Sequence, residues 1–257
     1  MRRLLQIIRF LVVIAVVGLF AAVALIVVGE GPEGLGDALN AIVAFIQGDQ
    51  QEASGPVTAP GLEEEAGARV FRIAQEESEV RFLIDEVLRG ADFTVVGATD
   101  QVAGDLRVDK GDPAASEIGL IRINARTLTT DNGNRNRALR TFILKSAEDE
   151  FEYAEFETSE VTGMPESVTV GEPFDIQILG ELRIAGATQA LAFDATITLE
   201  SEERLSGSAR SSLQHADLGL TIPSVPFVSD VAEEVRLEID FVALAVAEGE
   251  DQAPSSG

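Results

Sequence analysis

The feature that most constrains the fold is a regular alternation of apolar and polar residues in three long segments. Residues 174–184, 191–199 and 235–241 each place an apolar residue at every second position, and Gly180 keeps the phase in the first segment. Successive side chains of a β-strand point to opposite faces, so this pattern predicts long antiparallel strands that are buried on one face. The break at Ala185-Gly186-Ala187 indicates a hairpin turn between the first two strands.

Five earlier segments fit the same pattern less regularly, and one segment is helical. The five are residues 70–76, 79–87, 101–108, 117–125 and 151–157, and the helix covers 134–146 with Asp131 or Asn132 as its N-cap. About eight strands or more, with one helix and no strand–helix alternation, predict an all-β fold, either a closed barrel or a sandwich. Long strands favour closure, because an open edge promotes aggregation. An interior cavity would be apolar, but a solidly packed interior gives the same pattern.

The N-terminal region contains an uncharged apolar run over residues 10–28, preceded by Arg2, Arg3 and Arg9. Its length suits a helix that crosses a hydrocarbon core of roughly 30 Å. The basic residues precede the run and acidic residues follow it, so the N-terminus is expected in the cytoplasm and everything after Gly29 outside. A cleaved signal peptide, with Ala22-Val23-Ala24 as its cleavage motif, is the alternative, and it gives the same outside location.

The sequence predicts five regions. Residues 1–29 are a cytoplasmic stub and transmembrane anchor, 30–47 a membrane-proximal amphipathic helix, 48–68 an acidic flexible linker, 69–247 the barrel domain and 248–257 a disordered tail. The helix has an apolar stripe over residues 35–46, which would lie on the membrane, bind a protein partner or pack on the chain's own domain.

The composition excludes several kinds of chemistry. The chain has 44 acidic and 19 basic residues, a balance that disfavours nucleic-acid binding. It has no cysteine and a single histidine, His215, so it has neither a thiol nucleophile nor a multi-histidine metal site. Residues 131–136 fail the calcium-loop pattern and are interpreted as a turn into the helix cap. We therefore predict no catalytic residues, no metal and no cofactor.

Charged residues offer three further candidates. Arg135, Arg137 and Arg140 concentrate positive charge on the predicted helix, either for an anionic headgroup or for pairing with neighbouring carboxylates. His215 is either structural or orients a ligand headgroup. The acidic pairs within 147–157 are interpreted as an exposed edge or loop rather than a general acid and base.

Seven short motifs fit one family pattern over residues 70–247. They are Ser78-x-Val80-x-Phe82, 102–106 (VAGDL), 124–131 (NARTLTTD), 138–140 (ALR), 180–188 (GELRIAGAT), 215–220 (HADLGL) and 234–237 (EVRL), of which 180–188 is the most specific. Together they resemble the YceI-like family of bacterial extracytoplasmic proteins.

The resemblance implies an antiparallel lipocalin-like barrel with one short internal helix, here preceded by a single transmembrane helix. It implies an elongated apolar channel that holds a polyisoprenoid, a quinone or another lipid, and no catalytic residue. The residues expected to line the channel are Phe82, Phe142, Phe174, Ile176, Ile178, Leu182, Phe193, Ile197, Leu237, Ile239 and Phe241, with Arg135, Arg140 and His215 as headgroup candidates. The alternative is a structural accessory subunit of a membrane complex, with a solid barrel and no ligand.

Overall fold

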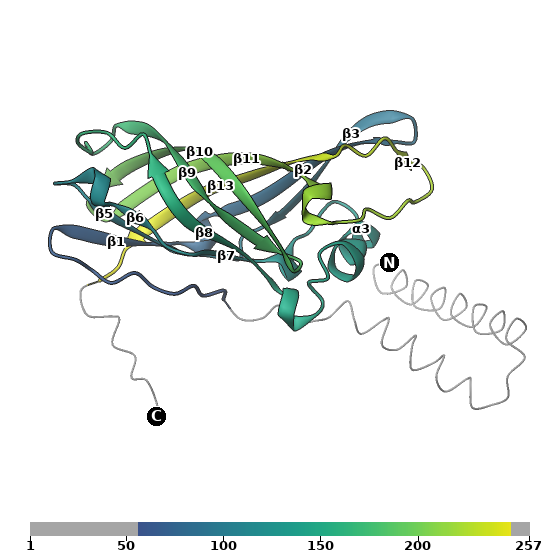
Figure 1. Ribbon diagram of the computed structural model, residues 1–257, viewed down its shortest axis with the longest axis horizontal. Coiled ribbons are helices and arrows are strands. Elements are labelled where there is room, and N and C mark those ends of the chain that lie inside the picture. Colours follow the sequence, from purple (N-terminus) through teal and green to yellow (C-terminus); the bar gives the residue numbers. More distant parts are fainter. Residues whose placement is uncertain (1–55, 248–257) are drawn as a thin grey trace, which may run out of the picture. The chain divides into compact units, whose positions relative to one another are not determined.

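A computed structural model describes residues 56–247 of the chain, which form one antiparallel sheet with short helical segments (Figure 1). The strands are β1 Ala68–Ile73, β2 Glu79–Leu88, β3 Ala91–Thr99, β4 Val102–Ala103, β5 Asp105–Asp109, β6 Glu117–Ile118, β7 Ile121–Asn124, β8 Tyr153–Thr162, β9 Pro173–Ile184, β10 Ala187–Ser201, β11 Arg204–Gln214, β12 Val228–Ser229 and β13 Glu234–Ala245. The helices are α3 Gly133–Ala138, the π-helix η5 Leu139–Ile143 and the 3-10 turns η2 Gln75–Glu77, η3 Pro113–Ala115, η4 Ala125–Thr127, η6 Asp149–Phe151 and η7 His215–Leu218.

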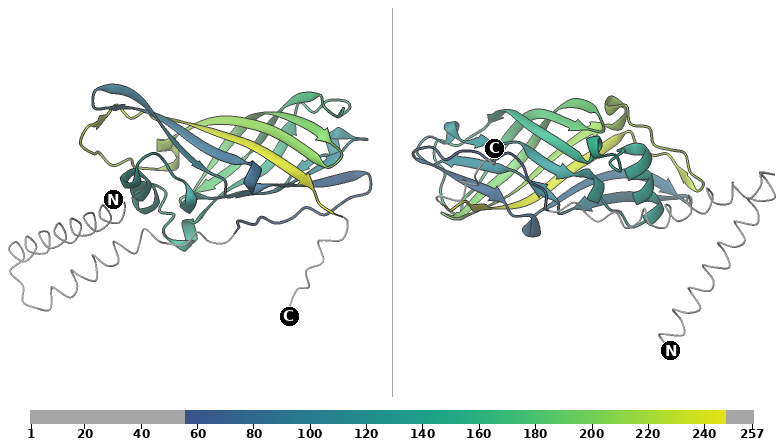
Figure 2. Two further views of the ribbon diagram at one scale, coloured as in Figure 1. Left: turned by 180° about the vertical axis from the view of Figure 1, so that it is seen from behind. Right: turned by 90° about the horizontal axis from the view of Figure 1, so that it is seen from below.

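The sheet curls until its two ends meet. Its order is β4-β7-β8-β9-β10-β11-β13-β1-β5-β6, yet β4 and β5 are separated in the chain by Gly104 alone. β4 pairs with β7 near one end of the sheet, and β5 pairs with β1 near the other end. The segment from β4 to β5 therefore connects the two ends of the sheet. The long strand β13 pairs first with β2 and then, nearer its C-terminal end, with β1. The curvature is visible in both views of Figure 2.

The sequence-based fold prediction is confirmed as an all-β, antiparallel curled sheet with one short helix. The hairpin at residues 185–186 is also confirmed, since β9 and β10 pair directly across it. Ala185 and Gly186 have φ angles of 52° and 82°, and two successive left-handed residues are what a tight two-residue hairpin requires. Three strands, β3, β11 and the two-residue β12, were not among the predicted segments.

The helical segment is shorter and less regular than the expected 134–146. Asn132 is the cap, since its side chain accepts hydrogen bonds from the backbone N–H groups of Asn134 and Arg135. The α-helical part ends at Ala138, and η5 continues with wider π turns. The wider turn places Leu139 and Leu144 together in a small buried cluster with Ala125 and Leu128, which explains the departure from α-helical geometry.

The chain before β1 lies against the sheet. Val57 is buried, its carbonyl accepts a hydrogen bond from Gln75, and the backbone N–H of Leu62 donates to Asp105. The acidic flexible linker predicted over 48–68 therefore contacts the domain at Val57 and Leu62, and its flexibility stays a prediction. The predicted anchor at 10–28, the stripe at 35–46 and the tail at 248–257 lie outside the described residues. Within residues 56–247, none of the helices has the length and apolar character needed to cross a membrane.

Asp105 anchors this arm, and its ion pair gives a first prediction. The residue is 2 % exposed and accepts two hydrogen bonds from Arg72, each of 2.9 Å, besides the one from Leu62. Replacing Arg72 by Met should lower the free energy of unfolding by about 2 kcal/mol, because a buried carboxylate loses its counter-charge while Arg72 itself is half exposed. Arg69→Met on the same strand is the control for urea unfolding. Equal losses in both variants would contradict the prediction.

Candidate ligand-binding cavity

The curled sheet encloses a cavity of about 640 Å³. This volume lies within the range of roughly 300–1,000 Å³ that is typical of small-molecule sites. Its wall consists mainly of the inward-facing apolar residues of the sheet, among them Val80, Phe82, Ile84, Val95, Ala154, Phe156, Ile178, Leu182, Phe193, Ile197, Ala209, Leu213, Val235, Leu237, Ile239 and Phe241. A wall of this kind offers few hydrogen-bond partners and suits an apolar chain.

The cavity is closed at one end. Leu106, Ile118 and Ile197 belong to its wall and also to the wall of a second, separate space of about 30 Å³. That space has room for only about two water molecules, so little open volume lies beyond these three residues. We refer to Leu106, Ile118 and Ile197 as the cavity floor.

The mouth lies at the opposite end, where α3, β12 and the turn between β2 and β3 come together (Figure 1). The loop 219–229 forms one side of it through Ile222, Pro223 and Val225. This loop is fixed at both ends. The Nδ1 atom of His215 lies 3.3 Å from the carbonyl oxygen of Leu220, and the backbone N–H of Arg89 donates to the carbonyl of Phe227 at 2.8 Å.

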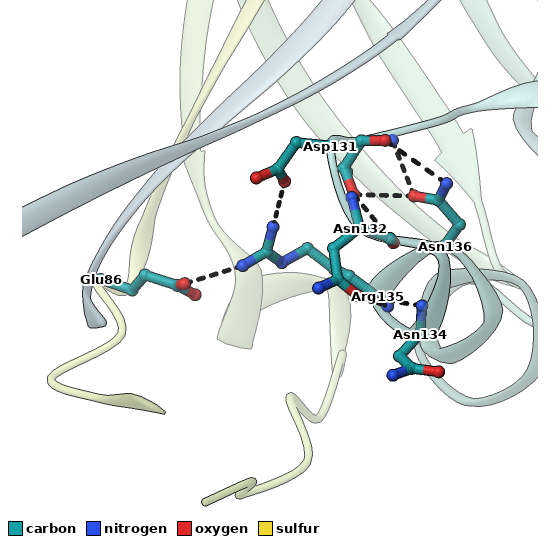
Figure 3. A network of polar contacts seen from close by, with 7 residues as sticks. Glu86, Asp131, Asn132, Asn134, Arg135 and Asn136 are labelled. Carbon is teal, nitrogen blue, oxygen red and sulfur yellow. Dashed lines mark hydrogen bonds and ion pairs between the residues drawn. The ribbon is translucent and has the colours of Figure 1, made fainter. Parts of the chain in front are cut away.

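A polar network forms the other side of the mouth (Figure 3). Arg135 on α3 contacts Glu86 on β2 at 2.9 Å and Asp131 at 2.6 Å. Its guanidinium carbon also lies 5.8 Å from the centre of the Phe93 ring. Glu86 is only 8 % exposed, so the pair joins the helix to the sheet at a largely desolvated position. Because two carboxylates already neutralise Arg135, the pairing interpretation of this residue fits the structure better than an anion site.

Three phenylalanine rings of the wall lie flat across glycines of the sheet. A Cβ atom on Gly97 would overlap the ring of Phe82, one on Gly180 would lie 2.6 Å from Phe156 Cζ, and one on Gly207 would lie 2.8 Å from Phe241. The missing side chains let the rings rest against the sheet instead of projecting into the lumen. The glycines therefore contribute to the volume of the cavity.

Eight of the eleven residues predicted to line a channel lie on the cavity wall: Phe82, Ile178, Leu182, Phe193, Ile197, Leu237, Ile239 and Phe241. Phe174 and Ile176 line the small space beyond the floor. Phe142 lies on η5 with 65 % of its surface exposed and does not belong to the wall. Of the headgroup candidates, Arg135 and His215 lie at the mouth, whereas Arg140 is not among the lining residues. Their part in ligand binding stays a prediction.

Sequence reasoning missed several residues of the site. Val95 and Ala209 lie on β3 and β11, which were not predicted, and Glu86 has no local partner that would have identified it. The loop residues Ile222, Pro223 and Val225 belong to an uncharged run over 218–229, a signal that was available in the sequence.

Two acidic residues of 147–157 have partners that hold them against the sheet, and the expectation of an exposed edge is wrong for Glu152. Glu152 is buried and accepts a hydrogen bond from Asn124, while Glu155 pairs with Arg122. In the part of the chain that the structure describes, no group of three or more potential metal ligands is found. Among the charged wall residues, Arg81 has its pKa raised, chiefly because Asp240 and Glu79 accept its hydrogen bonds, so it stays charged.

The Arg135–Glu86 pair gives a second prediction. Arg135→Met should destabilise the protein by about 2–3 kcal/mol, because it leaves the desolvated carboxylate of Glu86 without its counter-charge. The double variant Arg135→Met/Glu86→Met should recover at least half of that loss, since no buried charge remains. Urea unfolding of the wild type, these two variants and Glu86→Met forms a double-mutant cycle that gives the coupling energy of the pair. Additive losses would show that the two side chains are not coupled.

An antiparallel sheet curled around one apolar cavity, with a short helix at its mouth, defines the lipocalin-like class of folds. The YceI-like domain model matches residues 71–243, and the chain belongs to this family. The match covers the strands from β1 to β13 and therefore the whole cavity wall.

Two solved structures share the fold. A polyisoprenoid binding domain from Saccharophagus degradans, implicated in plant cell wall breakdown, has a TM-score of 0.54 and 14% sequence identity over 69% of this chain and 99% of that chain. BcnA from Burkholderia cenocepacia has a TM-score of 0.52 and 13% identity over 66% of this chain and 98% of that chain. Identities this low indicate a common fold only. None of the curated proteins compared with the sequence matches it significantly.

Proposed function

We propose that the protein binds one long apolar or amphiphilic ligand, such as a polyisoprenoid, a quinone or another lipid, inside the curled sheet. The observation that carries the proposal is the apolar cavity of about 640 Å³ that is closed at its floor and open at its mouth. Membership of the YceI-like family and the fold shared with a domain described as polyisoprenoid binding support the same ligand class.

The physical chemistry of the wall favours a hydrocarbon chain. Each buried methylene-sized group contributes about 0.8 kcal/mol, so about three five-carbon units would offset an association cost on the order of 10 kcal/mol. A polar headgroup would remain at the mouth, where Asn132, Asn134 and His215 lie. The carboxylates that already surround Arg135 favour a headgroup that is not strongly anionic.

The proposal includes a membrane tether and a location outside the cytoplasm. The uncharged run over 10–28 and the arginines before it support this arrangement. A reporter enzyme that is active only outside the cytoplasm, fused after residue 257, should be active in cells. A reporter that works only in its cytoplasmic form would contradict the location while leaving ligand binding unaffected.

The accessory-subunit alternative was motivated by the predicted anchor and the 35–46 stripe, and it expected a solid barrel. The open interior of about 640 Å³ supports the ligand-binding proposal over a solid barrel. A protein partner of the 35–46 stripe stays a prediction, because that segment lies outside the described residues.

Ligand binding can be tested on the unit Ser54–Gly257, which is compact by itself and contains the whole core. The fragment begins before Val57, so the arm that packs on the sheet is kept. We expect native mass spectrometry of the detergent-free protein to detect a co-purified lipid, and a fluorescent isoprenoid to bind saturably at one site. Neither a lipid nor saturable binding would overturn the proposal.

The cavity floor gives a third prediction. Leu106→Ala should join the main cavity to the small space beyond it, at a cost of about 2–5 kcal/mol in stability. The variant should then prefer isoprenoids one unit longer than the wild type prefers. Leu205→Ala, which enlarges only the small space, is the matched control. An unchanged chain-length preference would show that the floor does not limit the ligand.

A further inference from the structure

The loop on one side of the cavity mouth is packed more loosely than the rest of the cavity wall. Its residues that line the cavity are Ile222, Pro223, Val225, Pro226, Phe227 and Val228. None of these six belongs to the two hydrophobic clusters of the described chain, or to the residues that pack against those clusters. We refer to residues 221–229 as the mouth strap.

The middle of the mouth strap also lacks hydrogen bonds to the sheet. Within the described part of the chain, no backbone hydrogen bond joins residues 221–226 to another element. Two of these residues, Pro223 and Pro226, have no backbone N–H to donate. Segments with few buried apolar contacts and few backbone hydrogen bonds open locally at a low free energy. We therefore expect the strap to open more readily than the strands beside it.

The two bases of the strap are firmly held, and a left-handed residue lies at each of them. The backbone N–H of Leu220 donates to the 3-10 turn η7 at 3.2 Å, and that of Ala232 donates to the carbonyl of Asp85 at 2.8 Å. Gly219 has a φ angle of 64° and Asp230 one of 49°. A hinge consists of a few residues at the end of a loop that absorb a change of backbone angles. Gly219 and Asp230 occupy such positions.

Between these hinges, one short contact holds the strap against the sheet. The two residues of β12 pair with Val87 and Leu88 at the end of β2, and the N–H of Arg89 donates to the carbonyl of Phe227 at 2.8 Å. Phe227 has a φ angle of 71°, a strained conformation for a bulky residue. Opening this contact lets Phe227 leave that conformation, so relief of strain offsets part of the loss of hydrogen bonds. We call the pairing of β12 with β2 the strap contact.

The opposite side of the mouth is held more strongly. There the ion pair of Arg135 with the buried Glu86 ties α3 to β2 at 2.9 Å. The strap has no such pair, because residues 218–229 contain no charged side chain. It can therefore move over an apolar opening without removing a charge from water. Its residues Phe227 and Val225 are 74 % and 46 % exposed, apolar surface that closure over a hydrocarbon chain would cover.

We propose that the mouth strap is the gate of the cavity. It turns about Gly219 and Asp230, breaks the strap contact to admit a hydrocarbon chain, and closes over that chain when the contact forms again. The gate sets the rates of ligand entry and release more than the affinity. This proposal concerns the site of the proposed function and rests on it, but opening of the strap needs no ligand and is measured without one.

Hydrogen exchange of single amides measures the opening directly. The Arg89 amide is bonded to the strap and the Ala232 amide is bonded beyond the hinge, each at 2.8 Å. If the strap opens about Asp230, the protection factor of Arg89 should be at least about tenfold lower than that of Ala232. Equal protection of the two amides would overturn the proposal.

A disulfide across the strap contact tests the gating itself. The chain has no cysteine, so Leu88→Cys/Val228→Cys can form a single bridge. Positions 88 and 228 face each other next to the hydrogen-bonded pair of Arg89 and Phe227, where a Cα spacing of about 4.5 Å suits a disulfide. In stopped-flow experiments with a fluorescent isoprenoid and the unit Ser54–Gly257, oxidation should slow both association and release about tenfold or more. The Kd should change little.

The control is Glu181→Cys/Ala190→Cys, which joins facing exposed residues of β9 and β10 and should leave both rates unchanged on oxidation. An oxidised Leu88→Cys/Val228→Cys variant that exchanges ligand as fast as its reduced form overturns the gate. Reduced and wild-type protein that bind no isoprenoid overturn the proposed function, and hydrogen exchange then decides by itself whether the strap opens.

Discussion

Replacing Ala209 by Phe is expected to reduce the affinity for a long apolar ligand about 100-fold. Ala209 is a buried residue of β11 whose side chain lines the cavity between the mouth and the floor. A phenyl ring at this position would occupy space that three or four methylene-sized groups of the ligand need. At about 0.8 kcal/mol for each group, the loss is about 3 kcal/mol, and every 1.4 kcal/mol corresponds to a tenfold change in Kd.

The same substitution should leave the protein folded, because the new ring enters an open lumen instead of a filled core. Ala192→Phe is the matched control, since Ala192 is exposed on the outer face of the neighbouring strand β10. Titration with a fluorescent isoprenoid and a thermal unfolding curve of both variants make the comparison. Wild-type affinity in a folded Ala209→Phe variant would place the ligand outside the cavity.

The strands that could be predicted from the sequence are those whose inward positions carry large apolar residues. In β9, β10 and β13 most inward positions carry an isoleucine, leucine, valine or phenylalanine, so the period of two is plain. In β3 and β11 the inward positions include Gly97, Thr99, Gly207 and Ala209, and the pattern loses its apolar signal. These small residues are also what leaves the lumen open. The periodicity that predicts the sheet therefore could not predict the cavity.

The polar side of the mouth could not be predicted from the sequence, for a different reason. The bond between Arg135 and Asp131 is local, four residues apart on one helix end, and its geometry follows from the sequence. Glu86 precedes Arg135 by 49 residues and joins it only because β2 extends past the body of the sheet toward α3. Burial of Glu86 is a consequence of this tertiary contact, so its counter-charge could not be assigned beforehand.

The second large effect is expected for Gly97→Ala, which adds one methyl group to the sheet. The register of β2 and β3 places Gly97 directly opposite Phe82, and a Cβ atom at Gly97 would overlap three atoms of the Phe82 ring. The ring must leave the wall and turn into the lumen, or the two strands must separate. Overpacking of this kind costs about 1–3 kcal/mol, and the displaced ring removes cavity volume. Stability and ligand affinity should therefore fall together, in contrast to Ala209→Phe.

A rescue experiment tests this cause. In the double variant Gly97→Ala/Phe82→Leu the smaller side chain leaves room for the methyl group, so the two substitutions should be coupled by about 1 kcal/mol or more in urea unfolding. Gly133→Ala is the control, because no atom lies within 4 Å of its added Cβ and its φ angle is not left-handed. Additive effects of Gly97→Ala and Phe82→Leu would mean that the methyl group is accommodated without moving the ring. The position of the Phe82 ring would then not depend on Gly97. The glycines of the inner face would not determine the size of the cavity.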